Sequence, residues 1–272
     1  MPDSGPTGRE SLPLAERSDA DLPGHWLLAR LGKRVLRPGG LAMTARLLAT
    51  ARIEGADVVE LGPGLGRTAS DIVGLRPRSY VGVDDTAAAT EAVRRIVAPV
   101  AGSVVVADAS QTGLPDTSVD VVVGEAMLTM QSDKAKRAIV DEAFRVLRPG
   151  GRYAIHELGL APDSMPQATK DEIRRDMARA IKVNARPLTS AEWSKLLTEA
   201  GFEVASVDHA PMALLNPARV LADEGVVGAL RIVGNLIRRG AARRRVIGMR
   251  RTFHRYRRSL TAVGVVGVVP AS

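Results

Sequence analysis

Apolar positions along the chain follow two different spacings, which alternate between residues 53 and 160. Short runs rich in valine predict strands, because β-branched side chains pack well on a pleated surface. Stretches in which apolar residues return every three or four positions predict helices. The expected strands cover 57–61, 79–83, 103–107, 119–123 and 151–157, and the expected helices between them cover 66–75, 86–97 and 132–147. Such alternation is typical of right-handed βαβ crossovers and a mainly parallel sheet.

Further elements are expected on both sides of this core. The expected helices are 24–36 and 41–51 before it, and 171–183, 190–200, 217–238 and 241–259 after it, with strands at 202–208 and 261–269. We therefore expect a disordered lead-in over 1–22 and a single domain over 23–272. The domain divides into N-terminal helices (23–52), a core (53–160), a helical insertion (161–200) and C-terminal strands with an arginine-rich helical insertion (201–272).

One heptapeptide, Arg-Val-Leu-Arg-Pro-Gly-Gly, occurs at 34–40 and again at 145–151. The first copy precedes a helical pattern and the second precedes a strand pattern, which argues against a duplicated unit. Arginine near the negative end of a helix, followed by Pro-Gly-Gly, is typical of a helix end. Both copies are therefore predicted to close a helix.

Composition narrows the classes of chemistry. The 272 residues include 45% hydrophobic and 25% charged residues and no cysteine, which excludes disulfides, thiolate metal sites and a cysteine nucleophile. The first 22 residues show no apolar signal-peptide core, and no run reaches the roughly 18 apolar residues that a spanning helix needs. A soluble cytoplasmic protein is the expectation.

Positive charge is concentrated at the C-terminal end. The net charge is +8, and residues 225–272 hold 11 of the 38 basic residues, all arginine, with no acid. The first 224 residues therefore carry 27 basic and 30 acidic residues, a net charge of −3. The core is slightly acidic, so the basic character of the whole chain is not a nucleic-acid signature of the fold.

The stretch from Val58 to Gly66 predicts a ligand-binding turn. A buried strand ends at Glu60-Leu61 and runs into Gly62-Pro63-Gly64-Leu65-Gly66, and a helix follows. Glycines allow a tight turn and a close approach of ligand to backbone, and the following helix points free N–H groups at that ligand.

Four acids stand at or just beyond the ends of the first four expected strands, spaced 24, 24 and 17 residues apart. They are Glu60, Asp84, Asp108 and Glu125. Ligands of an open parallel sheet bind beyond the carboxyl ends of its strands, so we expect these acids to converge at one rim. Asp84 suits a ribose diol, and Asp108 can accept a hydrogen bond from an exocyclic amine such as that of adenine.

Two classes of ligand use such a rim. A dinucleotide would require a small residue at position 67, which is Arg67, and its pyrophosphate would be repelled by Glu60. S-adenosylmethionine has no phosphate and carries an ammonium and a sulfonium, so an acidic rim attracts it. The pattern favours S-adenosylmethionine.

Five motifs in order make the chain similar to the class I S-adenosylmethionine-dependent methyltransferases over about residues 55–160. They are Glu60-Leu61-Gly62-Pro63-Gly64-Leu65-Gly66, Val81-Gly82-Val83-Asp84, Ala107-Asp108-Ala109 with Leu114-Pro115, Val119-Asp120-Val121-Val122, and Leu147-Arg148-Pro149-Gly150-Gly151. The resemblance implies an α/β Rossmann-like sheet of seven mainly parallel strands, with helices on both faces, the last strand antiparallel and extra helices as a lid. It also implies S-adenosylmethionine as cofactor and S-adenosylhomocysteine as product.

The same resemblance implies roles for individual residues. Glu60 and the glycines 62, 64 and 66 would lie near the methionine moiety, Asp84 at the ribose hydroxyls, and Asp108 and Ala109 at the adenine; Pro63 and Asp85 are further cofactor-binding candidates. Asp85 stands where the family commonly has a hydrophobic or small residue. Glu125 would lie where the fourth strand opens onto cofactor and substrate. His25 and Trp26 fall on an N-terminal helix that often covers such sites in the family.

Methyl transfer is an in-line displacement, which mainly requires alignment of donor and acceptor and exclusion of water. A general base is needed only when the acceptor must lose a proton. The candidates for a catalytic role are His156, at the end of the fifth strand, and Glu125; a hydrogen-bonded structural histidine and a structural acid paired with an arginine are the alternatives. No His/Asp/Glu cluster has metal-ligand spacing, so no metal is expected.

The acceptor is expected to be a small organic molecule. Cytosine-C5 chemistry needs a cysteine, and the Asn/Asp-Pro-Pro-aromatic loop of the base amino-methylating relatives is replaced by Gly124-Glu125-Ala126-Met127. With few aromatic residues, base stacking is poorly provided for, so nucleic acid is an unfavoured partner. Met127, Leu128 and Met130 favour an apolar or lipid-like acceptor.

The arginine-rich stretch 241–259 leaves several roles open. Val246, Met249, Phe253, Tyr256 and Leu260 form an apolar stripe at helical spacing, surrounded by arginines. The stretch is expected to dock on the domain with a solvated basic face; contact with an anionic membrane, an acidic substrate or RNA is the alternative. The competing functions are an RNA methyltransferase that uses this arm and a non-catalytic protein that only binds S-adenosylmethionine.

Overall fold

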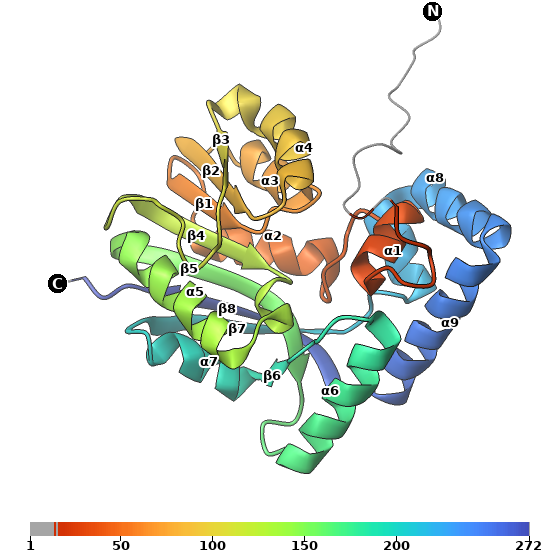
Figure 1. Ribbon diagram of the computed structural model, residues 1–272. Helices are drawn as coiled ribbons and strands as arrows, with labels where there is room; N and C mark the ends of the chain where they lie inside the picture. The colour runs from red at the N-terminus through yellow and green to blue at the C-terminus, as the bar shows by residue number, and fades with distance from the viewer. Residues whose placement is uncertain (1–13, 15, 272) are drawn as a thin grey trace, which may run out of the picture.

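A single mixed sheet forms the centre of the computed structural model, which describes residue 14 and residues 16–271 (Figure 1). Its strands are β1 (Asp57–Leu61), β2 (Ser79–Asp84), β3 (Ser103–Val106), β4 (Val119–Glu125), β5 (Leu147–Leu160), β6 (Leu188–Thr189), β7 (Glu203–Pro211) and β8 (Leu260–Val268). Their order is β3-β2-β1-β4-β5-β8-β7, with β6 paired to the end of β5. Every described pairing is parallel except those of β8, which runs antiparallel to both β5 and β7.

The expected Rossmann-like sheet with an antiparallel last strand is therefore confirmed, but the expected count of seven strands is wrong. The eighth strand is the two-residue β6, which pairs with Gly159 and Leu160. It forms because β5 continues to Leu160, three residues beyond the expected end, and offers its edge to Leu188 and Thr189.

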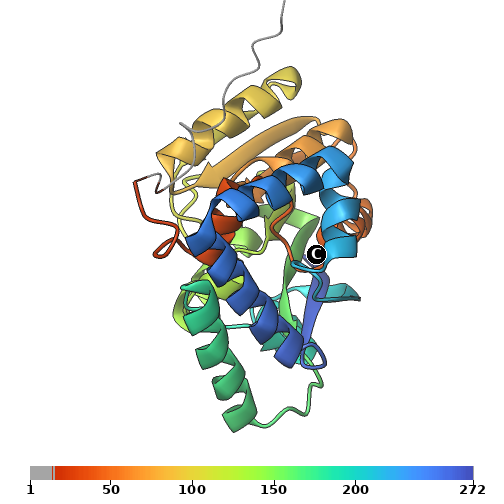
Figure 2. The ribbon, with the colours of Figure 1, turned by 90° about the vertical axis from the view of Figure 1, so that its right-hand side faces the viewer.

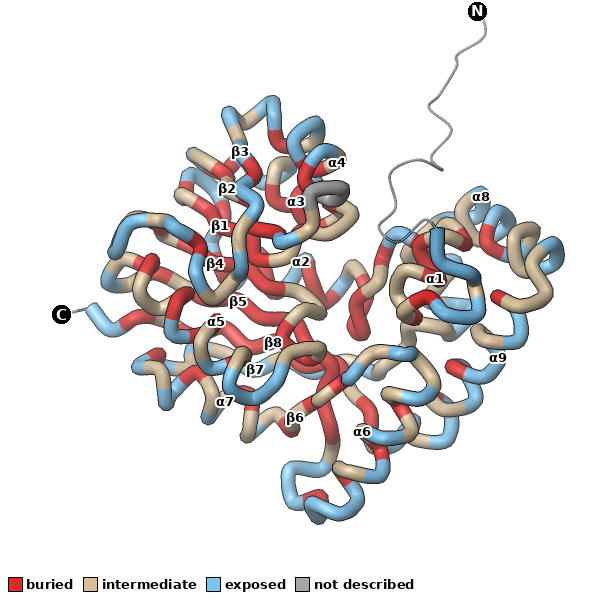
Figure 3. The backbone as a smooth tube through the Cα atoms, in the orientation of Figure 1, coloured by how far each residue is buried: buried red, intermediate tan, exposed pale blue. Residues whose placement is uncertain are grey.

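Helices cover both faces of the sheet and one of its ends (Figures 1 and 3). They are α1 (Gly24–Arg30), α2 (Gly40–Ala51), α3 (Arg67–Gly74), α4 (Ala87–Val97), α5 (Asp133–Val146), α6 (Gln167–Ile181), α7 (Ser190–Thr198), α8 (Pro217–Arg238) and α9 (Gly240–Arg255), with 3₁₀ turns η1 (Ala98–Val100) and η2 (Leu128–Met130). Neighbouring strand residues point to opposite faces, so Val58 packs with α2, α3 and α4, while Val59 packs with α5 and α7.

A helical cap of α1, α6, α8 and α9 lies beyond the carboxyl ends of the central strands (Figures 1 and 2). It has an apolar core of its own, in which Leu27 and Leu28 meet Met177, Met249 and Phe253. The buried face of α9 confirms that this arginine-rich helix docks on the domain. Among the described residues, no helix is both long and apolar enough to cross a membrane.

Two local predictions about the first 40 residues are wrong. The helix expected over 24–36 ends at Arg30, and the heptapeptide at 34–40, which was expected to close that helix, forms a loop that leads into α2. Polar contacts hold this loop, since the Glu224 carboxylate accepts hydrogen bonds from the N–H groups of Arg34 and Val35. The second copy does close a helix, because α5 ends at Val146 within it.

The disorder expected over 1–22 does not extend to residues 16–22. Residues 1–13 and 15 lie outside the described residues, but residues 16–22 pack against the cap. Leu22 is fully buried, and Asp19 pairs with Arg30 at 3.1 Å and with Arg239 at 3.0 Å.

Candidate functional site

A cavity of about 550 Å³ lies between the carboxyl ends of the strands and the helical cap. Its size falls within the range of about 300–1,000 Å³ that is usual for small-ligand sites. One part of its wall consists of the glycine turn after β1 and the ends of β1, β2 and β4. The cap supplies the opposite wall, with residues from α1, α6 and α9.

The glycine turn depends on backbone conformations that other residues avoid. Gly64 has a φ of +53°, and a Cβ added there would have no atom nearer than 3.9 Å, so the backbone itself faces open space. Gly66, which has a φ of +74°, does not line the cavity. A Cβ on it would lie 2.5 Å from Ile96 Cδ1, so this glycine allows α3 and α4 to pack closely.

The four strand-end acids meet at this cavity, as the sequence predicted. Glu60, Asp84, Asp108 and Glu125 all line it. Parallel pairing places β3, β2, β1 and β4 side by side, so equivalent positions on these strands come to the same edge of the sheet. The predicted residues Gly62, Pro63, Gly64, Asp85 and Ala109 also line the cavity, whereas Gly66 and His156 do not.

Glu60 is a buried acid with one strong partner. Its side chain accepts a hydrogen bond of 2.6 Å from the Tyr80 hydroxyl, and the residue is 3% exposed. Burial raises the pKa of Glu60 to about 8, and the nearby negative charge of Glu125 acts in the same direction. Both effects favour the neutral carboxyl over the carboxylate.

Asp84 and Asp108 are held by backbone donors. The Asp84 carboxylate accepts hydrogen bonds from the N–H of Gly64 at 3.1 Å and of Thr86 at 2.9 Å, which ties the end of β2 to the glycine turn. Asp108 accepts from the hydroxyl and N–H of Ser110, and these bonds lower its pKa. Asp85 is exposed and bonds the Thr86 hydroxyl at 2.9 Å.

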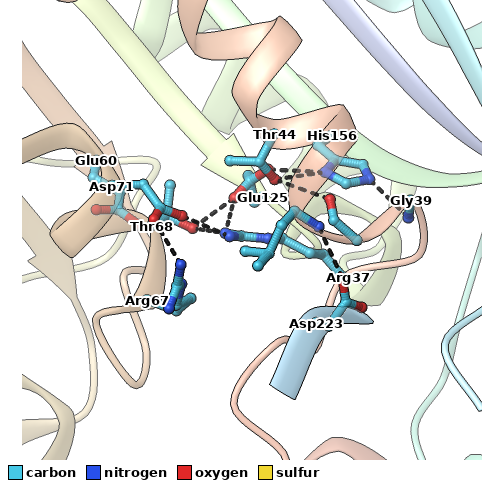
Figure 4. A network of polar contacts seen from close by, with 12 residues as sticks. Arg37, Gly39, Thr44, Glu60, Arg67, Thr68, Asp71, Glu125, His156 and Asp223 are labelled. Atoms are coloured by element: carbon cyan, nitrogen blue, oxygen red, sulfur yellow. Dashed lines mark hydrogen bonds and ion pairs between the residues drawn. The ribbon is translucent and has the colours of Figure 1, made fainter. Parts of the chain in front are cut away.

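Glu125 is the centre of a buried polar network between β4, α2, α3 and the 34–40 loop (Figure 4). One carboxylate oxygen accepts from the Thr44 hydroxyl at 2.6 Å and from His156 Nδ1 at 2.8 Å. The other accepts from Arg37 and from the Thr68 hydroxyl. Burial alone would raise the pKa of Glu125, but the charge of Arg37 and the bond from His156 outweigh it and lower the pKa to about 2.

The hydrogen bonds of His156 fix its tautomer. The Gly39 N–H donates to Nε2 at 3.0 Å, so Nε2 carries the lone pair and Nδ1–H donates to Glu125. The ring is fully buried, at 0% exposure, and is not part of the cavity wall. The geometry gives His156 the position of a structural histidine that orients Glu125 and the 34–40 loop.

Glu157, the neighbour of His156, holds the turn after β4. It accepts hydrogen bonds from the N–H groups of Met127, Leu128 and Thr129 at 2.8–3.0 Å, and from the Thr129 hydroxyl at 2.6 Å. Burial raises the pKa of Glu157 against these bonds. This acid fixes Met127, which lines the cavity.

Sequence reasoning missed the basic part of the site. Arg37 lines the cavity, is 5% exposed at its side chain and pairs with Asp71 at 2.9 Å as well as with Glu125. Thr68 on α3 bridges the same group. An arginine partner for Glu125 was one of the alternatives, but no sequence pattern pointed to Arg37, whose heptapeptide was predicted to close a helix.

The cap wall of the cavity is mainly apolar. Its members from the cap and adjoining segments are Trp26, Leu28, Leu36, Met130, Leu158, Met177, Ile181, Met212, Leu214, Met249 and Phe253. His25 also lines this wall, 4.8 Å from the Trp26 ring between centroids, and burial lowers the pKa of His25 to about 4. Within residues 14 and 16–271, no group of three or more His, Asp or Glu could hold a metal ion.

Comparison with known proteins indicates the class of enzyme that the chain resembles. Residues 59–155 match the methyltransferase-domain family model. An uncharacterized protein of Haemophilus influenzae is 35% identical over 223 residues, which span 80% of this chain and 87% of that protein. A probable S-adenosylmethionine-dependent methyltransferase of Mycolicibacterium smegmatis is 34% identical over 156 residues, or 56% of this chain and 54% of that protein.

The chain carries a class I S-adenosylmethionine-dependent methyltransferase domain. The fold agrees: a phosphoethanolamine N-methyltransferase 2 of Haemonchus contortus, solved in complex with S-adenosylmethionine, superposes with a TM-score of 0.66. That match covers 99% of this chain and 61% of the other at 16% identity, which establishes the fold alone.

S-adenosylmethionine is the cofactor of this methyltransferase, and the cavity suits it. The carboxyl groups of Glu60, Asp84 and Asp108 line one wall, which favours a ligand with cationic groups and hydroxyls over a phosphate. The open backbone at Gly64 leaves a cradle that any side chain would fill.

Proposed function

We propose that this methyltransferase acts on a small organic acceptor with an apolar part, by in-line displacement. One observation carries the proposal: the acidic rim and the apolar cap belong to the same cavity of about 550 Å³. The rim binds the cofactor, and the methionine, leucine and phenylalanine side chains opposite receive the acceptor. When bound, the cofactor supplies an electrophilic methyl group on a sulfonium.

The residues of the rim have distinct roles in this proposal. Glu60 would hold the cationic methionine portion of the cofactor, and that positive charge would favour its ionised carboxylate. Asp84, already oriented by two backbone N–H groups, accepts from the ribose hydroxyls. Asp108 and Ala109 form the part of the cavity wall that surrounds the adenine. Arg37 keeps Glu125 ionised and holds its side chain in place, so that this part of the cavity wall stays fixed beside the reacting groups.

The cap side chains align the acceptor and exclude water. Met177, Met249 and Phe253 come from α6 and α9 and share one apolar cluster with α1, so they form a packed wall. His25 offers a neutral ring nitrogen on this wall, because its pKa is about 4, and it can accept a hydrogen bond from an N–H or O–H of the acceptor. We assign no proton transfer to His156, whose two nitrogens are both engaged.

A labelling experiment tests the function. The protein is incubated with methyl-labelled S-adenosylmethionine and a fractionated metabolite and lipid extract, and Asp84→Ala serves as the cofactor-site control. We expect label in a small product that the control does not form. Label that enters only RNA would support the competing RNA methyltransferase. Cofactor binding without transfer to any fraction would support a non-catalytic binding protein.

A further inference from the structure

The outer face of α8 exposes an apolar stripe to solvent. Val226, Leu230, Val233 and Ile237 are 64%, 66%, 51% and 68% exposed, and Val227 beside them is 73% exposed. Their spacing of four, three and four residues places the first four along one line of the helix. Single exposed apolar residues are common on protein surfaces, but a contiguous row of five marks an interaction site.

The domain does not need this stripe to hold α8 in place. The opposite face of the helix is already anchored: Glu224 pairs with Lys33 at 3.3 Å, Asn235 donates to the Leu31 carbonyl at 3.0 Å, and Ile232 is buried. A break at Gly225, where φ is 70° and ψ is 176°, separates the first turns of α8, which Glu224 anchors, from the segment 226–238, which carries the stripe and is anchored by Ile232 and Asn235. The contacts that hold α8 in place therefore do not involve the exposed stripe.

Arginines are frequent on α8 and on the neighbouring α9, and the two helices follow one another on the same side of the molecule (Figure 2). Those that are exposed and form no ion pair within the described residues are Arg231, Arg238, Arg243, Arg244, Arg250 and Arg251. No acid occurs from residue 225 to 272. The last two acids of the chain, Asp223 and Glu224, bond inward to backbone N–H groups of the 33–41 segment.

We propose that the exposed α8 stripe and these arginines, together the α8–α9 outer face, form a docking site for an anionic lipid bilayer. An amphipathic helix that lies in the plane of a membrane buries its apolar face at the boundary of headgroups and acyl chains, and its basic residues meet the lipid phosphates. The α8–α9 outer face has both parts. The combination of the apolar stripe and the arginines favours a bilayer over other polyanions, because arginines alone would suit any polyanion.

Other occupants fit this face less well. A second copy of the chain would bring its own arginines against the first set, and residues 225–272 hold no acid that would neutralise them. A nucleic acid would pair with the arginines but would leave five exposed apolar side chains in water. An anionic membrane satisfies the charge and buries the stripe at once.

Docking would also place the cavity close to the lipid. Met249 and Phe253 of α9 line the cavity, while Arg250 and Arg251 on the same helix face outward. Only the thickness of one helix, about 10 Å, would then separate the cavity from the bilayer. This docking site is independent of the proposed acceptor and would stand if that proposal failed.

Vesicle co-sedimentation tests the docking site. The full chain is mixed with phosphatidylcholine vesicles, with and without phosphatidylglycerol, at physiological ionic strength. We expect binding to the anionic vesicles only. Arg243→Gln/Arg250→Gln/Arg251→Gln should weaken it by about fivefold for each charge, the equivalent of roughly 1 kcal/mol for a basic residue near an anionic surface. Leu230→Ser/Ile237→Ser should weaken it by about tenfold or more, because two apolar side chains no longer enter the bilayer.

Matched controls separate docking from general surface effects. Leu75→Ser/Arg76→Gln changes one exposed leucine and one exposed arginine just beyond the C-terminal end of α3, and should bind like the wild type. Val233→Trp should shift its fluorescence to the blue with anionic vesicles only. All variants should keep the wild-type affinity for S-adenosylmethionine, which shows that they are folded.

Three results would overturn the proposal. The first is the absence of binding to anionic vesicles, or binding that Leu230→Ser/Ile237→Ser leaves unchanged. The second is a wild-type dimer, without lipid, that this variant converts to a monomer, because the stripe would then belong to a second copy. The third is binding of RNA, but not vesicles, that depends on the arginines and not on the stripe.

Discussion

His156 and Glu125 are joined by a hydrogen bond of 2.8 Å, in which the histidine Nδ1–H donates to one carboxylate oxygen. The other oxygen of this carboxylate accepts a hydrogen bond from Arg37. Because Gly39 donates to the remaining ring nitrogen, the histidine has no free lone pair. The pair connects β5, β4 and the 34–40 loop beneath the cavity. It therefore behaves as part of the scaffold of the site.

Replacement of His156 should reduce stability more than catalysis. His156→Ala leaves the Gly39 N–H and the Glu125 carboxylate each without a partner and opens a buried space, so we expect a loss of about 2–4 kcal/mol in the free energy of unfolding. His156→Asn keeps a donor near Glu125 and should lose less. Urea denaturation measures both. An intact fold whose rate loses one limb of its pH profile would instead identify His156 as the general base.

Arg37 and Glu125 should show strong coupling in a double-mutant cycle. Each single replacement, Arg37→Met or Glu125→Gln, removes one member of a buried pair and should cost about 3–5 kcal/mol of unfolding free energy. The double variant should cost less than the sum, because neither charge is then left alone. Chemical denaturation of the four proteins measures this coupling. Additive losses would mean that the two side chains act independently.

The spacing of apolar residues predicted most of the fold, since valine-rich runs alternate with helical spacing from Asp57 to Leu160. Local pattern also placed Glu60, Asp84, Asp108 and Glu125 at one rim, because the carboxyl ends of parallel strands share an edge. The strand count was wrong only through β6, a two-residue strand that exists because a distant loop passes the end of β5. Two residues carry too little periodicity to predict.

The unpredicted part of the site depends on contacts between residues far apart in the chain. Arg37 lies 88 positions before Glu125, and nothing in the spacing links them. The 34–40 loop takes its shape from Glu224, 190 positions after Arg34. In the same way, the α9 stripe predicted a docked helix, but the exposed stripe on α8 emerged only once the structure showed which face was already covered.

The Glu224 anchor should control the stability of the cap. Glu224 and Lys33 are 3% and 2% exposed at their side chains, and Glu224 also accepts from two backbone N–H groups. Glu224→Gln leaves the lysine charge buried and unpaired, so we expect a loss of about 3–5 kcal/mol in unfolding free energy. Faster amide hydrogen exchange in α8 and the 33–41 segment should accompany it. Exchange that speeds up uniformly over the sheet would refute a local anchor.

Asp84 and Asp85 provide a matched pair for the cofactor site. Asp84 is buried and oriented by two backbone N–H groups, whereas Asp85 is exposed and accepts a hydrogen bond from the neighbouring Thr86 hydroxyl. Calorimetry should show that Asp84→Ala abolishes measurable S-adenosylmethionine binding. Asp85→Ala should change the affinity by less than about fivefold, as expected for a solvated hydrogen bond. Wild-type affinity in Asp84→Ala would overturn the assignment of the ribose acid.

The raised pKa of Glu60 should make the free protein less stable as pH rises. Its pKa is about 8 in the folded chain against an ordinary value of 4.5, so between these values the folded protein binds one proton more than the unfolded chain. Stability therefore falls across that window and levels off above pH 8. Glu60→Gln should flatten this slope in thermal melts, while Glu54→Gln, at an exposed glutamate, should not.

The same titration should couple cofactor binding to proton release. A cationic ligand favours the ionised carboxylate, so each ligand that binds below pH 8 must displace a proton from Glu60. The affinity for S-adenosylmethionine should then rise with pH by up to about tenfold per unit and level off near pH 8. Calorimetry at pH 7 in two buffers of different ionisation enthalpy should show release of nearly one proton, and none in Glu60→Gln. If the two buffers gave equal binding enthalpies for the wild type, Glu60 would not face the cationic part of the cofactor.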